Sequence, residues 1–270
     1  MYESFFGFTA KPFSTLADPR FLVETETHRE ALAALQYGIQ ERKGFIVLTG
    51  EVGTGKTLMI RALLERLGPE VATAYVTNPR MDLVGFFTCM FAEFGIPNRP
   101  ATKGDCLVAL NGWLIDQLVE GRTPVLIVDE GQSLSREMLE ELRLLTNLET
   151  AEHKLLHLVL AGQPELDTIL ADPALRQFVQ RITVRHRLLP LSKEETRQYV
   201  SLRLARVGAD ARRIFTDRAL RWIYRYARGI PRITNALCDS ALMIAYSAGQ
   251  REVTHRTVKE AARMVAAVAA

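Results

Sequence analysis

The stretch from Phe45 to Leu67 constrains the fold more than any other part of this sequence. It opens with the apolar run Phe45 to Thr49, passes through a glycine-rich turn, and continues as a helical pattern from Thr57 to Leu67. A short apolar run that ends at such a turn predicts a buried strand. The turn itself follows the pattern G-x-x-x-x-G-K-[ST], which occurs between a strand and a helix in phosphate-binding loops.

The residue types in this turn suit a polyphosphate ligand. Glycines such as Gly50 and Gly55 let successive backbone N–H groups point at phosphate oxygens, and the following helix adds its positive end. Lys56 would place a positive charge beside the β- and γ-phosphates, and the Thr57 hydroxyl would ligate magnesium. The flanking strand and helix argue against a glycine-rich turn without function. Nucleotide contacts are therefore expected from Gly50, Glu51, Val52, Gly53, Thr54, Gly55, Lys56, Thr57 and Leu58.

A second chemical signal follows about 70 residues later, where the apolar run Pro124 to Asp129 ends in two acidic residues. Successive side chains alternate along a strand, so Asp129 and Glu130 are expected to have different roles. Asp129 suits the magnesium shell, through water and Thr57. Glu130 suits polarisation of the water that attacks the γ-phosphate. Either acid alone would be an ordinary strand end, but together they predict a hydrolytic site.

The order of elements predicts an α/β fold followed by a helical domain. Apolar runs that alternate with helical patterns indicate βαβ units around a parallel sheet. After residue 191 helical patterns continue without a strand. We therefore expect a domain of residues 1–191, which begins with an aromatic arm, and a helical lid of residues 192–270. Strands are expected near residues 45–49, 71–76, 124–129, 155–161 and 182–188.

Composition bounds the compartment and the partners. A formal charge of +3 is too small to argue for nucleic acid by itself. Arginine is concentrated between Arg197 and Arg232, which indicates a solvated helical face or, alternatively, a surface for DNA, a lipid head group or an acidic partner. The three cysteines lack a metal-like spacing, and no apolar run reaches the length of a membrane helix. A cytoplasmic protein without a membrane span in this chain is expected.

These patterns together resemble those of the AAA+ ATPases. The segment RGIPRITNAL resembles the sensor-2 motif, in which an arginine contacts the γ-phosphate, and this places the role on Arg232 with Pro231 beside it. The segment LHLVLAGQPEL ends where the family carries a polar sensor-1 residue, here Gln163. The family usually has Asn, Thr or Ser at that point, so Gln163 departs from its pattern.

The same resemblance implies an arginine finger that completes the site of a neighbouring subunit. In LRQFVQRITVRHRLLPLS, Arg181 is the best match and Arg176 the second choice, while a surface salt bridge is the plain alternative for Arg181. An arginine in that role implies a homo-oligomer formed or stabilised by ATP. ATP and Mg²⁺ are the implied ligands.

The opening 57 residues, through GEVGTGKT, are similar to the ATPases of bacterial general secretion of the ExeA/GspA type and, less closely, to TniB/TnsC-type transposition ATPases. The first resemblance implies a role in an envelope secretion, pilus or export system with an envelope partner protein. In that family the ATPase continues into a membrane helix and a peptidoglycan-binding domain, so the chain is expected to be the cytoplasmic part of a longer protein or a free-standing relative.

Two alternatives to that function stay open at this point. One is an ATP-dependent, DNA-binding transposition regulator, and the other is a nucleotide-gated scaffold with little hydrolysis. The resemblance also places the adenine base near Phe21 and Leu22, although plain core packing is the alternative for Phe21. His28, in the same region, is interpreted as a residue near a helix start without a chemical role.

Overall fold

A computed structural model describes residues 1–14, 22–97 and 102–269, and it forms two compact units. One unit contains residues 30–50 and 59–188, and the other contains residues 1–29, 51–58 and 189–270. The first holds the sheet and the second is helical. The N-terminal residues and the glycine-rich turn thus group with the C-terminal helices, whereas the sequence-based division placed them in residues 1–191.

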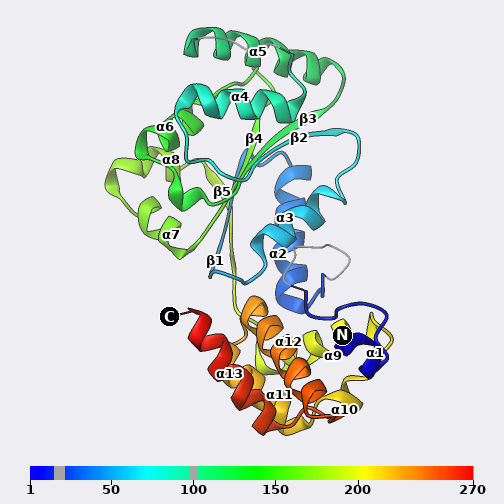
Figure 1. Cartoon of the computed structure of the whole chain (residues 1–270). Helices are drawn as coiled ribbons and strands as arrows, with labels where there is room; N and C mark the ends of the chain where they lie inside the picture. The colour runs from blue at the N-terminus through cyan, green and yellow to red at the C-terminus, as the bar shows by residue number, and fades with distance from the viewer. Residues whose placement is uncertain (15–21, 98–101, 270) are drawn as a thin grey trace. The chain divides into compact units, whose positions relative to one another are not determined.

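The first unit is built on a five-stranded sheet in which every pairing is parallel, with the strand order β2-β3-β4-β1-β5 (Figure 1). The predicted class, a parallel sheet with helices and a helical C-terminal region, is confirmed. The carboxyl ends of the strands therefore lie along one edge of the sheet, and the turns that follow them meet there. The strands are β1 (Phe45–Gly50), β2 (Val71–Val76), β3 (Thr123–Val128), β4 (His157–Gly162) and β5 (Ile182–Leu188).

Both faces of the sheet are covered. Phe45 and Val47 of β1 point into one large apolar cluster, whereas Ile46 lies so close to Gly38 of α2 that a Cβ at Gly38 would be 2.4 Å from Ile46 Cδ1. This alternation explains why the strands are apolar throughout. The cluster is covered by α4 (Leu83–Phe94), α5 (Lys103–Val119), α6 (Arg136–Leu145), α7 (Pro164–Leu170) and α8 (Arg176–Val179), while α2 (Glu26–Gln40) and α3 (Lys56–Leu64) begin in the other unit.

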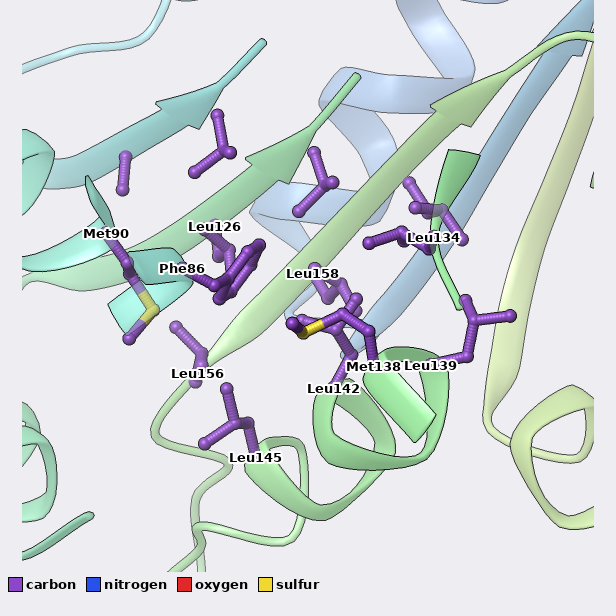
Figure 2. Close-up of a cluster of buried hydrophobic side chains, with 14 of the residues drawn as sticks. Phe86, Met90, Leu126, Leu134, Met138, Leu139, Leu142, Leu145, Leu156 and Leu158 are labelled. Atoms are coloured by element: carbon purple, nitrogen blue, oxygen red, sulfur yellow. The ribbon is translucent and has the colours of Figure 1, made fainter. Parts of the chain in front are cut away.

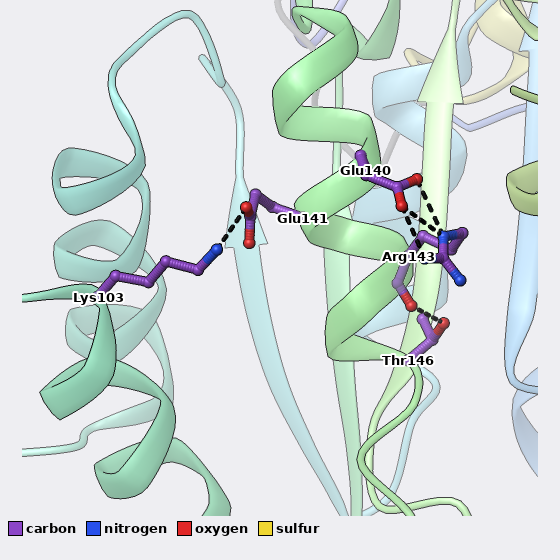
Figure 3. A network of polar contacts seen from close by, with 5 residues as sticks. All are labelled: Lys103, Glu140, Glu141, Arg143 and Thr146. Atoms are coloured by element: carbon purple, nitrogen blue, oxygen red, sulfur yellow. Dashed lines mark hydrogen bonds and ion pairs between the residues drawn. The ribbon is translucent and has the colours of Figure 1, made fainter. Parts of the chain in front are cut away.

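Apolar burial stabilises this unit more than its surface charges do. Figure 2 shows Leu158 of the sheet beside Met138 and Leu142 of α6, and Leu126 beside Phe86 of α4, all in one buried cluster. Each such side chain contributes about 1.5–3 kcal/mol when it is fully buried. In contrast, Figure 3 shows Lys103 paired with Glu141 at 2.5 Å on the surface. An exposed pair of this kind is worth about 0–1 kcal/mol.

The helical unit has its own apolar core, and the N-terminal arm is part of it. Tyr2, Phe8 and Phe13 are buried in one cluster with Val200 and Leu204. The arm is not irregular throughout, because it starts with the short helix α1 (Tyr2–Phe6). The other helices of this unit are α9 (Lys193–Ala205), α10 (Ala211–Ile214), α11 (Asp217–Ala227), α12 (Pro231–Ser247) and α13 (His255–Ala269).

Two arginines, one in α9 and one at its C-cap, donate to backbone carbonyls of residues 12–14 and of residue 22. Arg203 is buried and donates to the carbonyl oxygens of Pro12 at 2.7 Å and Ser14 at 3.3 Å. Arg206 donates to the carbonyl oxygen of Leu22 at 2.6 Å. A buried guanidinium with several acceptors fixes those carbonyls in position. No described helix is both long enough and apolar enough to cross a bilayer.

Candidate active site

The glycine-rich turn is stabilised by hydrogen bonds to one carbonyl. The Glu51 carbonyl oxygen accepts from Thr54 N at 3.3 Å, from Thr54 Oγ1 at 2.8 Å and from Lys56 Nζ at 3.1 Å. Lys56 is 7% exposed and Thr54 is 1% exposed. Because the Glu51 carbonyl holds the Lys56 ammonium against the turn, a positive charge stays largely buried at the start of α3. A buried cation of this kind favours an anionic ligand beside it.

Two positions of the turn need glycine. Gly53 and Gly55 have φ values of +81° and +106°, which L side chains rarely adopt. A Cβ at Gly53 would also lie 2.7 Å from the Cβ of Arg232. That closeness arises because Arg232 N, in the first turn of α12, donates to the Gly53 carbonyl at 3.2 Å. The turn is therefore joined directly to the helix that carries Pro231 and Arg232, and the Arg232 side chain is exposed.

His28 contacts the same turn, which sequence reasoning did not expect. The ring is 3% exposed, and its Nδ1 lies 2.8 Å from Thr25 Oγ1. Burial lowers the pKa of His28, and a hydrogen bond with the Thr54 backbone partly offsets this. The ring therefore lies against the Thr54 backbone. Its Nε2 would lie 3.6 Å from a Cβ at Gly55. His28 thus packs against the Thr54–Gly55 part of the turn, on the side of α2.

The residues of the turn fit a nucleotide phosphate with magnesium. Glycine-dependent main-chain N–H groups, a buried ammonium and the Thr57 hydroxyl are the donors and ligand that such a group requires. No set of three or more His, Cys, Asp or Glu residues in the described chain could hold a metal by itself. Magnesium is usually held by one or two protein oxygens together with phosphate oxygens and water.

The predicted acidic strand end is well ordered by hydrogen bonds. Asp129 is 3% exposed; its Oδ1 accepts from Glu130 N at 2.8 Å and its Oδ2 from the Tyr75 hydroxyl at 3.1 Å. Burial and the adjacent Asp129 raise the pKa of Tyr75, so this hydroxyl remains a proton donor. Tyr75 lies on the neighbouring strand β2 and was not identified from the sequence.

Glu130 does not continue the strand, so the alternation expected along a strand does not set its orientation. β3 ends at Val128, and Glu130 has φ 54°, a left-handed conformation at the start of the 3₁₀ turn Gly131–Ser133. Such a backbone costs about 1–3 kcal/mol in a residue other than glycine and is found mostly at functional sites. The strain is compensated by hydrogen bonds to the side chain.

Two glutamines hold the Glu130 carboxylate. Glu130 Oε2 accepts from Gln132 Nε2 at 2.5 Å and from Gln163 Nε2 at 3.1 Å. The Gln132 Oε1 in turn accepts from Gln163 N at 3.0 Å. Gln163, predicted as the sensor-1 residue, therefore contacts the predicted catalytic acid. Gln132 was missed, and its place directly after the acidic strand end was the only signal that the sequence offered.

The other predicted site residues that the structure describes do not contact the Glu130 carboxylate or its two glutamines. Arg181 directly precedes β5, at the edge of the sheet opposite to the carboxyl ends of the strands, and it is half-buried. Arg176 is exposed at the start of α8. Leu22 is buried, and its carbonyl accepts from Arg206. Phe21 lies outside the described residues.

Comparison with known proteins agrees with this architecture. A family model described as an AAA domain matches residues 39–170. The Aeropyrum pernix ORC2 protein has a similar structure, with a TM-score of 0.70 and 19% identity over 95% of this chain and 72% of that one. Cdc6p from Pyrobaculum aerophilum gives a TM-score of 0.67 and 19% identity over 94% of this chain and 70% of that one. Residues 39–170 of this chain are an AAA domain.

The sequence relatives of this chain divide between two processes. General secretion pathway protein A of Aeromonas hydrophila is 44% identical over 99% of this chain. The chain spans 49% of that relative, about half its length. The ATP-dependent target DNA activator B of Escherichia phage Mu is 26% identical over 87% of this chain and 71% of its own length.

We predict that Gly53→Ala weakens Mg-ATP binding by tenfold or more and lowers the melting temperature. The added methyl group meets a positive φ and the Arg232 Cβ at once. Calorimetric titration and thermal unfolding measure both effects. Gly112→Ala is the control, since a Cβ at Gly112 in α5 meets no atom within 4 Å. Unchanged affinity and stability in Gly53→Ala would contradict this packing.

We predict that His28→Ala lowers the affinity for Mg-ATP by about 5- to 30-fold, which corresponds to about 1–2 kcal/mol for a lost buried hydrogen bond. His28→Gln, whose amide can also form a hydrogen bond, should recover part of the loss. Thr25→Val should give a smaller loss of affinity, because it removes only the hydrogen-bond partner of His28 Nδ1. Equal affinity of His28→Ala and wild type, measured with both proteins folded, would show that the Thr54–Gly55 peptide does not need this support.

Proposed function

We propose that this chain binds ATP with Mg²⁺ and hydrolyses it to ADP and phosphate. The observation that supports this most directly is the turn Glu51–Gly55, whose glycines, buried Lys56 and contact with α12 match the needs of a phosphate loop. In this proposal the loop residues and Leu58 bind the nucleotide, and Thr57 and Asp129 hold the metal. When bound, the magnesium ion supplies charge neutralisation at the phosphates.

Glu130 is proposed as the acceptor of the water proton. Its Oε2 is held by Gln132 and Gln163, which leaves the other carboxylate oxygen, Oε1, to face a water molecule. The two amides fix the orientation of the carboxylate. Arg232 is proposed to contact the γ-phosphate from the start of α12, because its backbone is joined to Gly53.

We expect Lys56→Ala to abolish Mg-ATP binding, and Glu130→Gln to preserve binding while turnover falls by at least 100-fold. The first change removes the phosphate charge partner, and the second removes only the proton acceptor. Binding by calorimetry and phosphate release by a coupled assay distinguish them. The assignment of Glu130 is wrong if the Glu130→Gln protein turns over at the wild-type rate.

Homo-oligomerisation is proposed to complete the site, with Arg181 reaching a neighbouring subunit. Arg181 lies at the sheet edge opposite to Glu130, so it does not serve the site of its own chain. We predict that specific activity rises with protein concentration, and that Arg181→Ala and Glu130→Gln proteins, each inactive alone, regain activity when mixed. Mixing supplies sites with an intact Glu130 and a neighbour's Arg181. Absence of recovery in mixtures that form oligomers would contradict the proposal.

The process served is proposed to be assembly or regulation of a bacterial envelope secretion, pilus or export system, as the 44% identity to general secretion pathway protein A suggests. A DNA-dependent transposition role is the second candidate, and the similarity to the target DNA activator B supports it more weakly. Neighbouring genes separate the two: secretion genes favour the first and a transposase favours the second.

A further inference from the structure

Two helices of the C-terminal region begin side by side. The segments before α11 and α13 form a parallel bridge between Phe215 and Val253, in which Thr216 N donates to the Val253 carbonyl at 3.1 Å and Val253 N to the Ile214 carbonyl at 2.6 Å. The two segments therefore run in the same direction, and α11 and α13 start at the same level. The helices then pack against each other (Figure 1), with Ala219, Ile223, Val258 and Ala261 buried.

Each helix carries three exposed basic residues at matching positions. Counted from the bridge residues Phe215 and Val253, both sets occur three, six and ten positions later. These spacings place each set along one side of its helix. The α11–α13 basic face consists of Arg218, Arg221 and Arg225 on α11 and Arg256, Lys259 and Arg263 on α13, all of them exposed.

Contacts between the helices show that the rows belong to one face. The Lys259 Nζ of α13 lies 4.4 Å from the centre of the Trp222 ring of α11, and the Arg225 guanidinium lies 4.8 Å from the same ring. The pKa of His255, at the start of α13, is lowered by burial and then by the positive charges of Arg218, Lys259 and Arg256. The face is thus electropositive.

The acidic residues near this face are fewer than its six basic residues. Asp217 is paired with Arg197 at 2.7 Å on the side of α9. Glu252 and Glu260 line a pocket of about 830 Å³ at the starts of the two helices, together with Arg218, Arg251 and Arg256. None of the six basic residues takes part in an ion pair among the described residues.

We propose that the α11–α13 basic face binds the phosphate backbone of double-stranded nucleic acid. Each row spans eight residues, so its first and last members lie about 10 Å apart at 1.5 Å per residue, and this matches about three phosphates of one strand at 3.4 Å each. Five of the six cations are arginine, which pairs with phosphate through two parallel hydrogen bonds. The proposal is independent of the proposed ATP hydrolysis.

A membrane surface fits this face less well. Binding to a bilayer combines basic residues with apolar side chains that enter the acyl boundary. Trp222, the large aromatic of the face, already lies beneath Arg225 and Lys259. The exposed apolar side chains nearby are Tyr226 and Met264, one on each helix. Phosphates in a regular row therefore match the cations better than a lipid interface does.

Fluorescence anisotropy of a labelled DNA duplex, titrated with the full chain at several salt concentrations, tests the proposal. We expect the triple variant Arg218→Gln, Arg221→Gln, Arg256→Gln to bind at least about tenfold more weakly at moderate salt. Its slope of log affinity against log salt should be smaller than that of wild type by about 3. The triple variant Arg66→Gln, Arg212→Gln, Arg213→Gln removes the same charge elsewhere and should bind like wild type.

Other outcomes overturn the proposal. Equal losses in the two triple variants would mean that net charge, and not this face, attracts DNA. Undetectable duplex binding by wild type at low salt, or binding only to phosphatidylglycerol vesicles, would exclude nucleic acid as the partner. Unchanged ATP turnover and melting temperature in the first triple variant establish that any loss arises at the face. If turnover is absent from every protein while the duplex result holds, the proposed hydrolysis fails and this proposal stands.

Discussion

The hydrogen bonds that fix the turn Glu51–Gly55 are the interaction on which the rest of this structure depends. A main chain that must direct several N–H groups to one side has to satisfy its carbonyls elsewhere. Here the Glu51 carbonyl accepts from within the turn, the Gly53 carbonyl accepts from Arg232 N, and His28 contacts the Thr54 backbone. Each of these partners brings a different helix to the turn, so α2, α3 and α12 share one short segment.

The acidic strand end follows the same principle with side chains. Asp129 is oriented by Tyr75 and by the next peptide N–H, and Glu130 is oriented by Gln132 and Gln163. The donors come from β2, the turn after β3 and the start of α7, which the parallel sheet brings to one edge. Four neutral donors around the two carboxylates orient them separately. This separate orientation agrees with the different roles proposed for Asp129 and Glu130.

Sequence reasoning predicted the parts of this architecture that depend on local patterns. The apolar strands and the G-x-x-x-x-G-K-[ST] pattern fix the class of fold, and the helical C-terminal region follows from its caps. What it missed depends on contacts between distant segments. Gln132 and Tyr75 look like ordinary polar residues until the sheet places them beside Glu130 and Asp129. His28 was given no role because its partner Thr54 lies 26 residues further along the chain.

The register between α11 and α13 was likewise invisible in the sequence. The arginines of residues 197–232 were noted as a group, but their matching row on α13 appears only when Phe215 pairs with Val253. The arm is a similar case, since Tyr2, Phe8 and Phe13 read as aromatic residues of a nucleotide-binding domain and instead fill the core of the helical unit. Both differences arise from pairings that periodicity does not encode.

Calorimetric titration of the purified wild-type chain with Mg-ATP tests the central claim, that the turn Glu51–Gly55 together with Lys56 is a phosphate-binding site. The account predicts saturable binding with one nucleotide per chain, which weakens when magnesium is removed by a chelator. A folded protein that gives no binding heat at any of several temperatures, and whose melting temperature Mg-ATP does not change, would contradict it.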